Sequence, residues 1–100
     1  MIKLAWNKRF EKSLKRYIKK HPEKESIIVE KLLLFADEPF APGLRNHKLN
    51  GKLKNLRAIV IEPDCRVVFK LIDKETAMLI NIGSHESLFE KLIIQEIPEL

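Results

Sequence analysis

Residues 53–82, LKNLRAIVIEPDCRVVFKLIDKETAMLINI, decide the fold. Apolar side chains recur there at every second position over most of the stretch, which is typical of β-strands. Pro63-Asp64 predicts one tight turn, and residues 73–76 predict another. The turns divide the stretch into three predicted strands, at about 53–61, 65–72 and 76–82. Because both connections are short, successive strands should pair as an antiparallel meander.

Alternation along these strands predicts which side chains face the core. The predicted core face carries Ile59, Ile61, Val67, Phe69, Leu71, Met78, Ile80 and Ile82. The opposite face carries Lys54, Ala58, Val60, Glu62, Arg66, Val68, Lys70 and Asn81. Helices from the first half of the chain should cover the core face. We therefore expect the second face to be open and rich in charge.

The sequence before the meander predicts a short strand and two helices. Residues 2–6 alternate between large apolar side chains and small or polar ones, as in a half-buried strand. Helical periodicity then runs from a capping Asn7 to His21, where Pro22 ends the first helix and suits the first turn of a second. A loop rich in Pro and Gly follows at 37–43. Two helices with so short a link should form an antiparallel hairpin.

These elements predict an α+β fold, in which a helical hairpin packs on one face of an antiparallel sheet. The sheet is expected to hold the short N-terminal strand and the three-strand meander. With 100 residues, the chain is predicted to form a single domain over 1–100. The apolar-rich tail at 90–100 is interpreted as a C-terminal extension.

Composition excludes several classes of protein. The chain is 45% hydrophobic and 33% charged, with 3 Gly and 5 Pro, which is unlike collagen or disordered sequences. It has neither an apolar run long enough for a membrane span nor the apolar core of a secretory signal. The single cysteine, Cys65, cannot form an internal disulfide, which favours a reducing, cytoplasmic setting.

The net charge of +5 is distributed unevenly along the chain. Residues 1–60 carry +9, whereas residues 61–100 carry −4. A strongly basic front half predicts an anionic partner, with nucleic acid as the first candidate.

Three segments carry the residues best suited to catalysis or phosphate binding. They are 45–57, which holds His47 and several cations, the turn at 62–66, which holds Asp64, and 83–89, which holds His85. The predicted phosphate-binding cations are Lys52, Lys54, Arg57 and Arg66. Each segment is expected to lie in or beside the second face of the sheet.

Two histidines, a carboxylate and cations around one concavity suit acid–base cleavage of a phosphodiester. RNA supplies its own nucleophile, the 2′-hydroxyl, so an enzyme need only move two protons and neutralise the phosphate. Imidazole suits both proton transfers, because its ordinary pKa of about 6.5 lies close to working pH. Arg and Lys suit the phosphate, and Phe89 is placed to stack on a splayed base. No cofactor is expected, and the spacing of His47, Asp64 and His85 does not favour a metal site.

Structural interpretations of the same residues remain open. Asp64 after Pro63 is a common turn pair, and Phe89 would equally well pack against the sheet edge. His21 is interpreted as structural. Cys65 shares the parity of the core residues, which favours a buried, inert thiol.

Read in order, these segments resemble the RelE/ParE superfamily of bacterial toxins, and within it the YafQ-like branch. The resemblance covers roughly residues 1–89. It is carried by HKLNG at 47–51, IEPD followed by VVFK between 61 and 70, and GSHESLF at 83–89. Three such fragments in this order, in a basic chain of this length, are fairly specific. The resemblance implies a RelE-like fold and a toxin of a type II toxin–antitoxin pair.

By position, the resemblance implies active-site roles for His47, Asp64, His85 and Phe89. It implies a ribosome-dependent endoribonuclease acting on mRNA. Its partners would be the ribosome, mRNA and an antitoxin, and the basic first helix would contact ribosomal RNA. YafQ-like proteins carry a further histidine on the strand before the Pro-Asp turn, where this chain has Val60. Two alternatives stay open: a ParE-like inhibitor of DNA gyrase, and a catalytically weakened homologue that binds RNA or protein.

Overall fold

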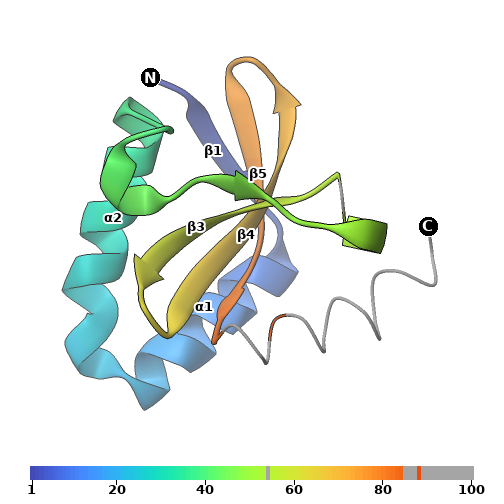
Figure 1. Cartoon of the computed structure of the whole chain (residues 1–100). Coiled ribbons are helices and arrows are strands. Elements are labelled where there is room, and N and C mark those ends of the chain that lie inside the picture. Colours follow the sequence, from blue (N-terminus) through green and yellow to red (C-terminus); the bar gives the residue numbers. More distant parts are fainter. Residues whose placement is uncertain (54, 85–87, 89–100) are drawn as a thin grey trace.

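A computed structural model describes residues 1–53, 55–84 and 88 of the chain. The five strands are β1 (Lys3–Trp6), β2 (His47–Lys48), β3 (Arg57–Glu62), β4 (Cys65–Asp73) and β5 (Thr76–Gly83). The helices are α1 (Lys8–Lys20) and α2 (Glu25–Asp37), and short 3₁₀ turns are η1 (Pro22–Lys24), η2 (Pro42–Leu44) and η3 (Gly51–Leu53). The strands form one sheet in the order β1-β5-β4-β3-β2, and both helices lie behind it in the view of Figure 1.

The predicted α+β class and the meander β3-β4-β5 are confirmed. The sheet differs from the prediction in being mixed, because β1 pairs with β5 in parallel, from Lys3 opposite Thr76 to Trp6 opposite Leu79. A fifth strand, β2, was not predicted, and it pairs antiparallel with β3. A meander has only two free edges, and β1 and β2 occupy one each.

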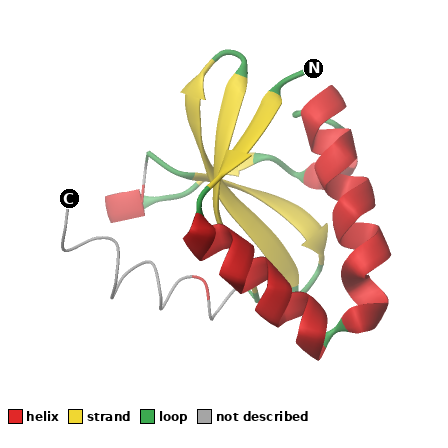
Figure 2. Cartoon of the chain, turned by 180° about the vertical axis from the view of Figure 1, so that it is seen from behind, coloured by secondary structure: helices red, strands yellow, loops and turns green. Residues whose placement is uncertain are grey.

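The helices begin where the sequence predicts. The Asn7 side chain accepts a hydrogen bond of 3.0 Å from the backbone N–H of Phe10, which caps α1. Pro22 then opens η1, and α2 continues from it. The two helices meet at η1 and spread apart from it (Figure 2), so they are not paired along their length. α1 packs mainly on β5, whereas α2 lies nearer β3.

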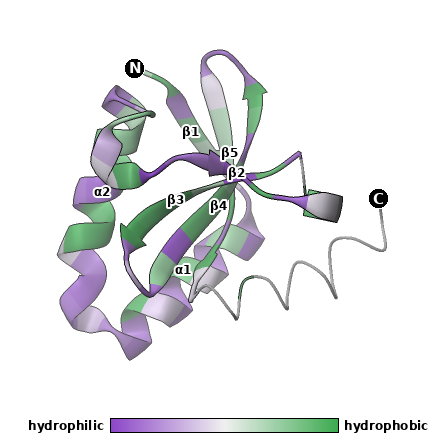
Figure 3. Ribbon diagram, in the orientation of Figure 1, coloured by the Kyte–Doolittle hydropathy of each residue, from purple (hydrophilic) through white to green (hydrophobic). Residues whose placement is uncertain are grey.

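The main core fills the space between the helices and the sheet. Its buried members are Phe10, Ile28, Phe35, Leu44, Ile59, Ile61, Cys65, Val67, Phe69, Ala77, Leu79 and Ile82. The rings of Phe35 and Phe69 lie 4.7 Å apart between centroids, so they join α2 to the middle of the sheet. Figure 3 shows hydrophobic residues concentrated along β3 to β5 and hydrophilic ones along β2 and much of the helices.

Part of the predicted core is wrong because β5 contains a β-bulge. Val68 pairs with Asn81 but Phe69 pairs with Leu79, so Ile80 is an extra residue that shifts the alternation. Leu79 therefore faces the helices, whereas Met78 and Ile80, predicted for that face, do not.

Leu71 also departs from the predicted core. It lies toward the β4–β5 turn and is 43% exposed, outside the main core cluster. Asn81 is buried instead, and its side chain accepts a 2.8 Å hydrogen bond from the backbone N–H of Ile82.

The second face of the sheet is not open at its centre, contrary to the prediction. A second buried cluster lies there, made of Leu49, Leu53, Ala58, Val68 and Leu88. The segment that contains η3 thus folds over the middle of β3 and β4. No helix among the described residues is long and apolar enough to cross a membrane.

Candidate functional site

The structure describes part of the predicted site. His47 lies in β2, Arg57 in β3, Asp64 in the β3–β4 turn and Arg66 in β4, while Lys52 belongs to η3. Lys54, His85, Phe89 and the predicted extension at 90–100 lie outside the described residues. Their roles stay predictions.

His47 is exposed and is held by a backbone contact. Its Nδ1 lies 2.7 Å from the carbonyl oxygen of Arg45, a residue with a left-handed φ of 48°. A carbonyl only accepts hydrogen bonds, so in this contact Nδ1 carries the proton and the Nε2 of a neutral ring keeps its lone pair. His47 pairs with Ala58, a member of the second-face cluster. The ring is therefore oriented on the second face with a nitrogen able to accept a proton.

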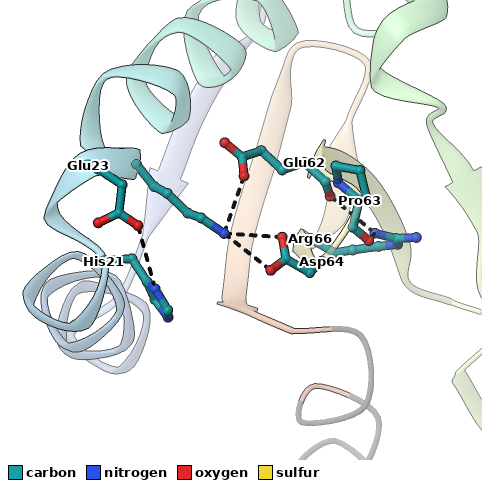
Figure 4. A network of polar contacts seen from close by, with 7 residues as sticks. His21, Glu23, Glu62, Pro63, Asp64 and Arg66 are labelled. Carbon is teal, nitrogen blue, oxygen red and sulfur yellow. Dashed lines mark hydrogen bonds and ion pairs between the residues drawn. The ribbon is translucent and has the colours of Figure 1, made fainter.

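Asp64 is tied to the helical layer by Lys24, a contact the sequence did not reveal. The Lys24 Nζ lies 3.2 Å from each carboxylate oxygen of Asp64 and 3.3 Å from Oε2 of Glu62 (Figure 4). The lysine side chain is only 15% exposed, whereas that of Asp64 is 70% exposed. Hydrogen bonding to Lys24 lowers the pKa of the Asp64 carboxyl, and the Asp64 contact raises the pKa of Lys24.

Replacing Lys24 with methionine should raise the pKa of Asp64 toward its ordinary value of about 3.9. A depressed carboxyl pKa stabilises the folded state above the unfolded pKa, and this contribution is lost as pH falls. The difference in the free energy of unfolding between wild type and Lys24→Met should therefore narrow below about pH 4. NMR titration of the carboxyl carbon and denaturation at several pH values measure the two effects.

Lys19→Met supplies the matched control for this pair, because it removes the same charge from the exposed surface of α1. The Lys19→Met substitution should leave the pKa of Asp64 unchanged. An unchanged Asp64 titration in Lys24→Met would show that the contact does not hold the carboxylate in solution.

Tyr17 and Cys65 lie beneath the same turn. Cys65 is fully buried, which confirms the predicted burial of its thiol. Burial raises the pKa of the thiol, so it stays protonated near neutral pH. Burial is the main effect that raises the pKa of Tyr17 to about 12, and a hydrogen bond with Cys65 is the next largest. Both groups are therefore neutral and able to donate hydrogen bonds near neutral pH.

The two predicted arginines lie on different faces. Arg57 pairs with Phe69 of the main core, its Nε donates to Asn46 Oδ1 at 2.7 Å, and its guanidinium lies 5.5 Å from the ring centroid of Phe40. Arg66 pairs with Val60, and one of its terminal nitrogens donates to the carbonyl oxygen of Pro63 at 2.8 Å.

The structure thus brings His47 and Arg66 to the second face and does not bring Arg57 there. Asp64 lies at the end of the sheet, with its carboxylate directed to Lys24 (Figure 4). Within the described ranges, no group of three or more His, Cys, Asp or Glu side chains is arranged to hold a metal ion.

The chain is a small basic α+β protein, with two helices on one face of a mixed five-strand sheet and cations and a histidine at the margins of that sheet. The family model described as "Bacterial toxin of type II toxin-antitoxin system, YafQ" matches residues 2–90. The chain belongs to this YafQ family of type II toxins, as the sequence resemblance implied.

Comparison with solved structures supports this assignment. A metal-bound toxin from Helicobacter pylori is 31% identical, with a TM-score of 0.70, and the match covers 89% of this chain and 100% of that one. YafQ from E. coli is 20% identical with a TM-score of 0.73, covering 89% and 99% of the two chains. The E. coli DinJ–YafQ toxin–antitoxin complex matches at 24% identity and a TM-score of 0.66, covering 88% and 97%. No curated protein matches the sequence significantly.

Proposed function

We propose that the protein is a ribosome-dependent endoribonuclease that cleaves mRNA through the RNA 2′-hydroxyl. The observation that carries the proposal is the orientation of the exposed His47 ring, whose Nδ1 lies 2.7 Å from a backbone carbonyl oxygen. In the neutral form of the ring, this contact places the proton on Nδ1 and leaves the lone pair on Nε2. A neutral imidazole with one nitrogen tied in this way is suited to removing a proton. Membership of the YafQ family supports the same reaction.

In this proposal, His47 and His85 share the two proton transfers. One takes the proton of the 2′-hydroxyl, and the other protonates the leaving 5′-oxygen. Asp64 would orient or help to activate one of the histidines, and its ion pair with Lys24 holds the carboxylate at the β3–β4 turn. The products are a 2′,3′-cyclic phosphate, or its hydrolysed 3′-phosphate, and a 5′-hydroxyl.

The remaining predicted residues bind the RNA. Arg66 and the cations Lys52, Lys54 and Arg57 neutralise phosphates, and Phe89 stacks on a base. Arg57 would act from the sheet edge, because Asn46 and Phe40 hold its guanidinium there. Val60 is half-buried on the second face opposite Arg66 and adds no titratable group to the reaction. The proposed mechanism uses no metal and no cofactor.

The proposed partners follow from charge and from family. DinJ is the partner in the E. coli DinJ–YafQ complex. We propose an antitoxin here as well, with an acidic or amphipathic segment that folds as it covers the basic surface. The cations of α1 would contact ribosomal RNA, and the cytoplasm would be the site of action.

A ribosome complex programmed with a defined mRNA tests the proposal. The mRNA should be cut when the protein is added, and a single 2′-deoxy sugar on the 5′ side of the cut should abolish cleavage at that site. Mapping of 5′ ends measures the cut, and 5′-phosphorylation by a kinase detects the 5′-hydroxyl. Normal cutting of the deoxy substrate would overturn the 2′-hydroxyl mechanism. Inhibition of gyrase supercoiling without RNA cleavage would favour the ParE-like alternative.

A further inference from the structure

A hollow of about 190 Å³ lies where the last turns of α1 meet the end of β5. It is lined by Ser13, Arg16, Tyr17, Lys20, His21, Ile82, Gly83 and Ser84. This volume is too small for a drug-sized ligand but leaves room for a tetrahedral oxyanion.

The α1 lining comes from one face of the helix. Ser13, Arg16, Tyr17 and Lys20 follow the spacing i, i+3, i+4 and i+7, which places them in one row. Ser13 and Tyr17 are half-buried, whereas Arg16 and Lys20 are exposed. The row therefore presents two cations and two hydroxyl groups to the hollow, and Arg9, four residues before Ser13, lies on the same face of α1.

The polar groups of the hollow suit an anion. The Tyr17 hydroxyl is neutral near neutral pH and hydrogen-bonded to Cys65, so it adds no negative charge to the hollow. The described residues that line the hollow include no carboxylate. Asp64, which lies close enough to influence Tyr17 and His21, is paired with Lys24. Glu23 lies 3.9 Å from Nδ1 of His21, so we assign the anion to Arg16 and Lys20 and not to the imidazole.

The end of α1 presents fewer free carbonyl groups to an anion than an uncapped helix end would. The backbone N–H of His21 donates to the carbonyl oxygens of Tyr17 at 2.9 Å and Ile18 at 3.2 Å. These contacts satisfy two of the carbonyls that give a helix C-terminus its negative character. Lys19 and Lys20 in the last turn offset that character further.

We infer that this hollow binds one backbone phosphate of the RNA strand, next to the phosphate that is cut. The inference rests on the proposed function. Its location supports it, because Ser84 lines the hollow and directly precedes His85, the residue proposed to transfer a proton. Arg16 and Lys20 bind the phosphate oxygens, and the Ser13 and Tyr17 hydroxyls also line the hollow. The hollow thereby fixes the register of the strand relative to the cut. The other cations of α1 are left for the proposed contact with ribosomal RNA.

The experiment scans the charge of single phosphates. The probe is a ribosome programmed with an mRNA oligonucleotide whose A-site codon and its neighbours are 2′-O-methyl nucleotides, which lack the nucleophile and cannot be cleaved. A series of probes carries one uncharged methylphosphonate at each successive position, and fluorescence anisotropy at fixed salt measures Kd. For the wild type, one position should weaken binding about tenfold more than the others, as expected for loss of a charge-assisted contact.

Two double variants make the test specific. Arg16→Ala/Lys20→Ala removes the cations of the hollow, and Lys15→Ala/Lys19→Ala removes the same charge from another face of α1. The hollow variant should lose the positional effect, whereas the control should keep it and show only a general decrease in affinity. Circular dichroism and thermal melting establish that both variants fold.

The outcomes separate this inference from the proposed function. Equal sensitivity at all positions in the wild type, or an unchanged positional effect in the hollow variant, would overturn the subsite while leaving RNA cleavage intact. Loss of affinity for a glutamate-rich peptide in the hollow variant, with binding to the programmed ribosome unchanged, would assign the hollow to a protein partner and overturn the RNA assignment. A cleavage assay that fails with every RNA would instead overturn the proposed function.

Discussion

Replacing His47 with asparagine is expected to slow mRNA cleavage by about 10²–10⁴-fold, the usual contribution of a general acid or base. The asparagine amide can donate to the Arg45 carbonyl much as Nδ1 does, at a contact now 2.7 Å long. It offers no basic nitrogen in place of Nε2. The substitution therefore keeps the local hydrogen bond and removes the proton acceptor. Quantified mRNA cleavage on programmed ribosomes, under single-turnover conditions, measures the loss.

Comparison with His47→Ala distinguishes chemistry from structure. Alanine removes both the contact to Arg45 and the acceptor, so the two variants should be similarly slow if the acceptor matters. A purely structural role predicts near wild-type cleavage by His47→Asn and a defect in His47→Ala alone. That result would remove His47 from the mechanism while leaving the family assignment untouched.

Phe69→Ala is expected to lower the free energy of unfolding by about 3–5 kcal/mol. Phe69 is fully buried in the middle of β4, and its ring lies 4.7 Å from that of Phe35 between centroids. Truncation removes apolar surface from the core and leaves a cavity between the sheet and α2. A loss of this size is a large share of the roughly 5–15 kcal/mol that stabilises a typical domain. Urea denaturation followed by circular dichroism measures it.

Phe40→Ala makes the same chemical change at the surface. Phe40 is 66% exposed, and the Arg57 guanidinium lies over its ring. An exposed cation–π contact contributes about 0.5–1 kcal/mol, so the loss should stay near that value. Equal losses in the free energy of unfolding for the two variants would contradict the assignment of Phe69 to the main core.

The elements set by local signals were predictable from the sequence. Asn7 and Pro22 act within one turn of the residues they cap or interrupt, so the bounds of α1 followed from neighbouring residues. Pro63-Asp64 marked the β3–β4 turn for the same reason. The parallel pairing of β1 with β5 depends on which sheet edge is free after the meander forms, and no local pattern encodes that.

The errors in the predicted core have a physical origin in β5. Strict alternation assigns Met78, Ile80 and Ile82 to one face, but the bulge at Ile80 breaks the alternation within the strand. β-Branched and aliphatic residues fit both faces here, because Leu49 and Leu53 make the second face apolar as well. Two apolar faces give no compositional signal for the position of a bulge.

The sequence indicates residue types for the candidate site but not how those residues are arranged. His47 lies on the predicted face, and its sequence neighbours gave no sign that the Arg45 carbonyl would orient the ring. Lys24 was missed because its partner Asp64 is 40 positions away, and one lysine in a basic chain has no distinctive context. Arg57 was placed with the other cations by sequence proximity, whereas its strand parity places it on the helix face.

The pairing of β1 with β5 sets the order in which the chain can fold. Lys3 pairs with Thr76 and Trp6 with Leu79, so the first strand has no edge to join until residues 76–79 have left the ribosome. Contacts between such distant residues require a large loop to close first, which slows folding relative to structures with local contacts. Synthesis itself thus delays completion of the sheet. A nascent copy of this toxin remains without its finished fold for most of the time that it is being made.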